Sequence, residues 1–171
     1  DFQLIEGNAP RNMVLVPAGP FLLGVQNGAP DERPQQTIEL KAFYIDRYEV
    51  TNRQYKAIYP DFEYLDGEDD FPVTGITYTQ AEAYAKAVNK RLPTEFEWEK
   101  AARGTEGWQY PWGNDWIADR CASAEMGVDA ALHPVGSFRE GVSPFGCFDM
   151  AGNAAEWTST WYNPYEGNRD I

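Results

Sequence analysis

Histidine, cysteine and long apolar runs are all scarce in this 171-residue chain. The single histidine, His133, excludes histidine-rich metal sites within the chain and leaves at most one imidazole for acid–base chemistry. No stretch approaches the roughly 18 apolar residues that a membrane-spanning helix needs. The most apolar segment, residues 13–25, is interrupted by Pro17, Gly19 and Pro20. The sequence therefore predicts neither a histidine-based metal centre nor a membrane span.

Positive charge is also scarce, because 14 basic residues face 27 acidic ones and give a formal net charge of −13. Such a field repels phosphate backbones and anionic lipid headgroups, so we expect no nucleic-acid partner and no membrane insertion, whereas cations remain suitable ligands. Hydrophobic residues make up 43% and aromatic residues 15%. This composition indicates a globular protein, and the length suits one domain.

The cellular compartment is only weakly constrained. Cys121 and Cys147 could form one disulfide or be two buried thiols, and a lone pair does not fix the redox environment. No basic segment precedes the apolar residues, so no signal peptide is evident. A processed N-terminus would look the same, so export stays open, and an extracytoplasmic location (periplasmic or secreted) is favoured.

Apolar patterning predicts several short strands. Residues 13–17 and 21–25 are apolar runs joined by turn residues, and strict alternation predicts one strand over residues 37–45. Residues 157–162 are predicted to form a further strand with Trp157 and Trp161 on one side.

Three capping boxes predict helix starts, at residues 51–54, 79–82 and 94–97. The third helix is expected to end at Gly104 and to turn Trp98, Ala101 and Ala102 inward. Short helices, short strands and long loops together indicate the α+β class.

Two further groups of side chains are given structural roles. Glu95, Glu97 and Glu99 are interpreted as helix surface and capping residues, not as an acid–base pair. Large aromatic side chains fill the cores of loop-rich folds. We expect this role for most of Trp108, Trp112, Trp116, Trp157 and Trp161.

Several segments, taken in order, are similar to one known family. They read MVLVPAGPFLLG, ERPQQTIELKAFYIDRYEVTNRQY, PVTGITYTQAEAYAKAVNKRLPTEFEWEKAARG, YPWGN, HPVGSF and SPFGCFDMAGNAAEWTSTWY. The chain resembles the formylglycine-generating enzyme (sulfatase-modifying factor) family along nearly its whole length. The resemblance implies an irregular, loop-rich fold related to the C-type-lectin fold. It also implies a single domain over residues 1–171 that lacks the family's final third.

The resemblance also implies a copper chemistry that this sequence does not supply. The family's catalysts bind copper(I) with two cysteines and oxidise a substrate cysteine with oxygen, and soft thiolates suit this ion. Their cysteine pair lies beyond a Gly-Gly-Ser strand that would follow Ile171. Cys121 and Cys147 lie upstream of it, with 25 residues between them. No catalytic residue is therefore predicted, and copper is expected only if residues beyond Ile171 provide two cysteines.

A structural calcium site is the cofactor that the resemblance implies. Side-chain oxygens would come from Asp149 and Glu156, and main-chain carbonyls from Gly152 and Ala154. Calcium takes six to eight oxygen ligands of these types. Alternatively, the two carboxylates hold a tight turn through local hydrogen bonds. The family's other calcium site uses an asparagine near the position of Ala122 and is weakened here.

Two functions stay open at this point. The first is a non-catalytic, calcium-supported scaffold or protein-binding subunit, whose protein partner could be a chain that completes the fold. The second is a formylglycine-generating oxidoreductase whose catalytic cysteines lie beyond residue 171. An iron-dependent sulfoxide synthase of the same fold is disfavoured by the lone histidine.

Overall fold

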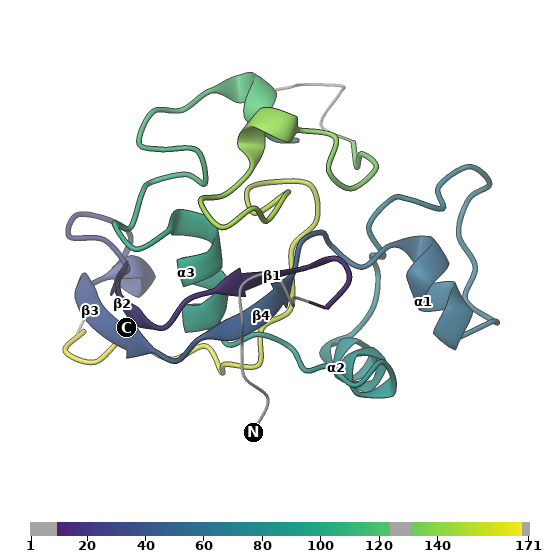
Figure 1. Ribbon diagram of the computed structural model, residues 1–171, viewed down its shortest axis with the longest axis horizontal. Coiled ribbons are helices and arrows are strands. Elements are labelled where there is room, and N and C mark those ends of the chain that lie inside the picture. Colours follow the sequence, from purple (N-terminus) through teal and green to yellow (C-terminus); the bar gives the residue numbers. More distant parts are fainter. Residues whose placement is uncertain (1–9, 124–130, 169–171) are drawn as a thin grey trace.

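The computed structural model describes residues 10–123 and 131–168. Within them, two antiparallel sheets have two strands each (Figure 1). Strand β1 (Met13–Val16) pairs with β4 (Phe43–Asp46), and β2 (Gly19–Leu23) pairs with β3 (Gln36–Leu40).

The single strand expected over residues 37–45 is two strands. β3 follows the edge of β2, with Ile38 opposite Phe21, whereas β4 follows β1, with Ile45 opposite Val14. Between β3 and β4 the chain passes from one sheet to the other. The hydrogen-bond ladder with β2 therefore ends, although apolar and polar residues still alternate in the sequence. The expected strand over residues 21–25 lies two residues earlier, at β2.

Two of the three capping boxes begin helices where the sequence predicts them. Helix α1 (Asn52–Ile58) starts after Thr51, and α3 (Glu95–Arg103) starts after Thr94. Each threonine hydroxyl accepts a hydrogen bond from the amide three residues later. Gly104 ends α3 with φ at +72°, as glycine permits. None of the helices in the described residues is long and apolar enough to span a membrane.

Helix α2 (Tyr78–Ala87) starts two residues earlier than expected. Its cap is Thr77, whose hydroxyl accepts from the amide of Gln80 at 3.3 Å, so the predicted box that begins at Thr79 is wrong. Both threonines have a suitable polar residue three positions later, and the local pattern cannot choose between them. The structure also contains 3-10 turns at η1 (Pro30–Glu32), η2 (Ala118–Arg120) and η4 (Arg139–Gly141).

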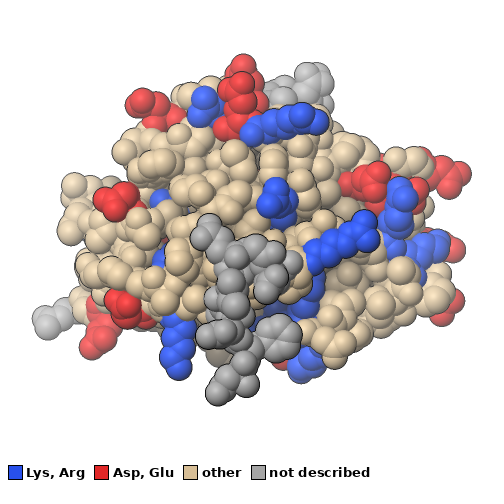
Figure 2. Space-filling view, viewed as in Figure 1, with Lys and Arg blue, Asp and Glu red and all other residues tan. Residues whose placement is uncertain are grey.

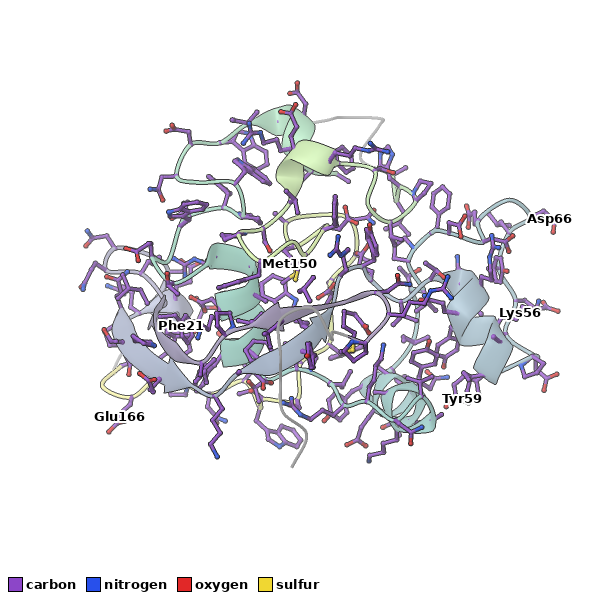
Figure 3. All side chains as sticks on the ribbon, in the orientation of Figure 1. Phe21, Lys56, Tyr59, Asp66, Met150 and Glu166 are labelled. Atoms are coloured by element: carbon purple, nitrogen blue, oxygen red, sulfur yellow. The ribbon has the colours of Figure 1, made fainter. Side chains whose placement is uncertain are left out.

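The main core lies between α3 and the sheets. Ala101 and Ala102 are almost fully buried there, and Trp98 packs beside them, as predicted. Figure 3 shows Met150 near the centre of the molecule and Phe21 beside β2. The buried members of this cluster are Val14, Val16, Phe43, Ala101, Ala102, Cys147 and Met150.

Helices α1 and α2 pack together away from this core (Figure 1). The rings of Tyr55 and Tyr84 stack between them with centroids 5.3 Å apart. The loop between α1 and α2 includes residues 61–70, which carry acidic side chains at the edge of the molecule (Figure 2). Arg53 lies 3.3 Å from Asp69, so part of this charge is neutralised locally.

The predicted strand over residues 157–162 is absent. The segment instead crosses loops: the Trp157 indole donates to the Ile76 carbonyl at 3.1 Å, and the Ser159 amide donates to the Pro93 carbonyl at 2.8 Å. Trp161 is 86% exposed. A core-filling role is therefore wrong for Trp116, Trp157 and Trp161, which are all exposed.

Candidate functional site

A cavity of about 1030 Å³ opens between β4 and α2, and we call it the groove. It follows a strand: residues 42–46, which include all of β4, line it in succession. The opposite wall comes from Ala81, Tyr84 and Ala85 of α2. Loop residues add to the lining at 48–50, 72–76, 88–93 and 153–157, and Glu97 of α3 lines the groove as well.

Four carboxylates and two basic side chains line the groove. Both basic groups are already paired. Lys90 Nζ lies 2.6 and 2.8 Å from the two oxygens of Asp46, and Arg91 makes two hydrogen bonds with Glu97, of 2.6 and 2.7 Å. The remaining carboxylates, Glu49 and Glu156, make no salt bridge within residues 10–123 and 131–168.

Glu49 is the most constrained group of the groove. It lies between β4 and α1, is only 8% exposed, and accepts hydrogen bonds from the amide of Ala154 (2.9 Å) and the side chain of Asn153 (2.6 Å). Burial raises the pKa of Glu49 to about 8, and the charges of Glu156 and Asp149 add to the effect. The sequence analysis missed this residue, because its partners lie more than 100 positions away.

The partners of Glu49 belong to a tightly coiled loop, residues 149–156. Asp149, Gly152 and Asn153 all have positive φ, at 59°, 83° and 54°. Gly152 is required by space as well, because a Cβ atom there would lie 2.0 Å from the carbonyl oxygen of Ala122. The loop therefore packs closely against the backbone of Ala122.

The two carboxylates of this loop are both held in place by neutral donors. Asp149 accepts from the amide of Gly136 at 2.6 Å, and Glu156 accepts from the Trp98 indole. Burial raises the pKa of Asp149, although the Gly136 amide and His133 oppose it. Solvent reaches Glu156 on the groove wall, but the protein around the carboxylate and the nearby charge of Asp149 raise its pKa to about 7.

A match to a known family confirms the resemblance that the sequence motifs indicate. The model of the "Sulfatase-modifying factor enzyme 1-like domain" matches residues 2–170. The chain belongs to this family. Its four predicted calcium ligands therefore lie in a loop of a sulfatase-modifying-factor domain, and that loop forms one wall of the groove.

Curated relatives of this family member carry different names. A hercynine oxygenase of Mycolicibacterium smegmatis is 32% identical over 205 residues, which covers 90% of this chain and 46% of the relative. A formylglycine-generating enzyme of Thermomonospora curvata is 27% identical over 223 residues, which covers 90% of this chain and 72% of the enzyme. The chain thus spans about half the length of the hercynine oxygenase.

Solved structures confirm the fold class of this family domain. Treponema denticola variable protein 1 superposes with a TM-score of 0.77 at 20% identity, covering 89% of this chain and 73% of that protein. The small sheets, short helices and long loops are those of the irregular α+β fold that is related to the C-type-lectin fold, as the sequence predicts.

The calcium prediction stays a prediction for this family member. Asp149 and Glu156 are close enough for the charge of one to raise the pKa of the other. Their hydrogen bonds run to Gly136 and Trp98, in other segments, so these contacts do not close the turn locally. Among the described residues no group of three or more His, Cys, Asp or Glu side chains could hold a metal ion, but the predicted site uses two carboxylates and two carbonyls.

The structure also tests the predictions for the two cysteines and for one glutamate. Cys121 and Cys147 are both buried and no disulfide joins them, so the disulfide alternative is wrong and they are two buried thiols. Burial raises the pKa of Cys147 to about 12, which makes it a poor metal thiolate at neutral pH. Glu99, expected on the surface of α3, is buried beside Arg103.

Proposed function

We propose that this sulfatase-modifying-factor domain is a calcium-supported scaffold that binds another polypeptide in the groove. One observation carries the proposal: the loop with the predicted calcium ligands also forms part of one wall of the groove. Residues 153–157 line the groove, and Ala154 and Glu156 are predicted ligands among them. A cation that orders this loop would therefore also order the binding surface.

The residues of the loop fit a calcium ion. Asp149 and Glu156 would supply carboxylate oxygens, and Gly152 and Ala154 main-chain carbonyls. Burial raises the pKa of Asp149, and the protein around Glu156 together with the charge of Asp149 raises the pKa of Glu156, so a positive charge in this loop would favour both ionised forms. Calcium, when bound, supplies the missing positive charge. The ion has a structural role in this proposal.

A polypeptide suits the groove for two reasons. Its volume of about 1030 Å³ lies just above the range typical of small-molecule pockets, which is roughly 300–1,000 Å³. It also follows β4 along consecutive residues, and extended peptides commonly bind beside a strand of their receptor.

Calcium titration tests the proposal. We expect calcium to raise the melting temperature of the chelator-treated protein, and isothermal calorimetry to give one calcium site. Asp149→Asn and Glu156→Gln each remove one charged ligand, so calcium affinity should fall at least about tenfold in either variant. Asp61→Asn, in the exposed loop after α1, is the matched control and should bind calcium like the parent protein.

Two results would contradict the scaffold proposal. Calcium affinity that stays unchanged in both loop variants would remove the metal site from residues 149–156. Failure of every peptide in a large library to bind the groove would remove the polypeptide-binding role.

A copper-dependent oxidoreductase is the second candidate, favoured by the similarity to a formylglycine-generating enzyme over 90% of this chain. Cys121 and Cys147 are too buried to provide its copper site, so two further cysteines would have to lie outside these 171 residues. Tight copper(I) binding together with oxygen-dependent oxidation of a cysteine peptide would establish this function in place of the scaffold.

A further inference from the structure

We infer that a second, smaller cavity beside the groove binds a small oxyanion, which is a phosphate, sulfate or carboxylate group. This cavity has a volume of about 170 Å³, and its lining comes mainly from residues that precede β1, follow β4 or lie on α1 and α2. We call it the side pocket. Asp46 and Lys90 line both cavities, so the side pocket adjoins the groove. The inference depends neither on calcium nor on what occupies the groove.

The side pocket is rich in hydrogen-bond donors that no protein group uses. Within residues 10–123 and 131–168, five of its side chains offer donors that make no hydrogen bond to the protein, namely the guanidinium of Arg11, the amide groups of Asn12 and Gln54, and the hydroxyls of Tyr48 and Tyr84. The orientation of the Gln54 amide is fixed, because its Oε1 accepts from the amide of Thr51 at 3.0 Å. Its NH2 group is therefore the unused donor.

The acceptor side of the pocket, by contrast, is already engaged. Asp46 is the carboxylate of its lining, and Lys90 Nζ lies 2.6 and 2.8 Å from the two oxygens of Asp46. This ion pair leaves the charge of Arg11, which makes no salt bridge in the part of the chain that the structure describes. The lining thus has a net positive charge, although the whole chain carries −13.

The missing components of the site are therefore acceptors and one negative charge. Water can accept from the unused donors, but it does not balance Arg11. An oxyanion supplies both, because its oxygens are acceptors and a guanidinium binds two of them at once. The ligand is small, since about 170 Å³ equals the share of liquid that five or six water molecules occupy at roughly 30 Å³ each. A phosphate, sulfate or carboxylate group fits this space, whereas a nucleotide does not.

Isothermal calorimetry of the intact chain with inorganic phosphate tests the inference, in chelator and at constant ionic strength. We expect saturable binding at one site. Arg11→Gln should weaken it about tenfold, because a hydrogen bond to a charged group contributes at least that much. Arg139→Gln changes an exposed arginine outside the side pocket, so this control should bind phosphate like the parent protein.

Gln54→Glu is a second variant, chosen because it keeps the fold. Residue 54 closes the capping box of α1 with Thr51, and glutamate serves in this position as well as glutamine. The new carboxylate replaces a donor and repels an anion, so phosphate binding should fall further than in Arg11→Gln. An unchanged melting temperature shows that the loss of binding is local.

Parallel titrations with sulfate, acetate and glycerol phosphate identify the source of the oxyanion. Tighter binding of inorganic phosphate than of glycerol phosphate supports a free ion, and the reverse supports a phosphate group on a larger molecule. Saturable binding of acetate alone supports a carboxylate. The inference is overturned if no oxyanion binds better than chloride, if affinity is unchanged in both Arg11→Gln and Gln54→Glu, or if Arg139→Gln loses as much affinity as Arg11→Gln.

Discussion

Two buried glutamates on different sides of the molecule have opposite surroundings. Glu99 on α3 is 9% exposed, pairs with Arg103 and accepts from the amide of Gly24 at 2.7 Å. Glu49 on the groove wall is 8% exposed and has only neutral donors. Burial raises the pKa of both, yet only Glu99 has a cation against it.

The different surroundings indicate a structural role for Glu99 and a candidate binding role for Glu49. Arg103 also donates to the carbonyls of Trp108 (2.6 Å) and Gly107 (2.9 Å), so its ion pair with Glu99 anchors the end of α3 to the surrounding loops. Such a closed network leaves nothing for a ligand to satisfy. Glu49 has no cation against it within the described residues, and burial raises its pKa to about 8; a perturbed acid of this kind beside an open groove is a candidate for a binding site.

The largest expected effect comes from breaking the balanced site. Arg103→Met removes the cation and leaves Glu99 buried and unpaired, so the free energy of unfolding should fall by about 3–5 kcal/mol. Urea unfolding at pH 7 measures this loss. Arg103→Lys, which keeps the charge but not the planar donors, should lose less. A loss below about 1 kcal/mol in Arg103→Met would show that the pair is not the anchor of α3.

A smaller, pH-dependent effect is expected from Glu49→Gln. The folded-state pKa of Glu49 is about 8 against an ordinary value of 4.5, so ionisation costs stability, from about pH 4.5 upward until about pH 8. The glutamine variant avoids this cost. The difference between the two pKa values implies a full cost of about 5 kcal/mol. Relaxation of the protein around the ionised carboxylate reduces this cost, so the variant should be more stable than the parent at pH 9, relative to pH 4, by roughly 2–3 kcal/mol.

Thermal unfolding in chelator across this pH range measures the Glu49 effect, with Glu63→Gln as the exposed control. If parent and Glu49→Gln lose stability in parallel as pH rises, the charge of Glu49 is balanced after all. The two buried glutamates would then not differ in their charge balance.

The smallest effect is expected at an ion pair whose basic partner lies largely in solvent. Glu97 caps α3 and pairs with Arg91, whose side chain is 65% exposed. Burial opposes ionisation, but Arg91 and the Thr94 amide lower the pKa of Glu97 overall. The charged form therefore stabilises the fold above about pH 4.5, and this contribution fades as acid protonates the group.

Glu97→Gln should accordingly cost only about 0.5–1 kcal/mol at pH 7, since solvent screens the exposed partner. Denaturant unfolding at pH 7 and pH 3 checks the sign, because the difference from the parent should shrink in acid. A cost as large as that of Arg103→Met would mean that the exposure of the basic partner does not distinguish these two ion pairs.

Local devices were predictable from the sequence, and their failures are instructive. Thr51 and Thr94 begin helices because a capping box needs only four consecutive residues. Thr79 failed because Thr77 offers the same spacing two residues earlier, and only the packing of α2 selects between them. Trp157 matched a strand pattern, but in the described structure its segment pairs with no strand and contacts the loops at Ile76 and Pro93 instead.

The groove and its charge balance were not predictable in the same way. Glu49 precedes a helix cap and resembles any surface acid, while its partners Asn153 and Ala154 lie 104 and 105 positions later. Glu99 sits two residues from the exposed-looking Glu97, and nothing in the α3 pattern marks it as buried. Burial of a single charge depends on which distant segments cover it.

The sequence by itself determined the family, the fold class, the helix caps at Thr51 and Thr94 and the inward face of α3, because each depends on order or on contacts within a few residues. Only the tertiary structure decided the sheet change after Leu40, the groove beside β4 and the burial of Glu49 without a cation among the described residues. These features depend on segments about 100 residues apart meeting at one place, and desolvation acts on the assembled surroundings of a residue, whatever its neighbours in the chain.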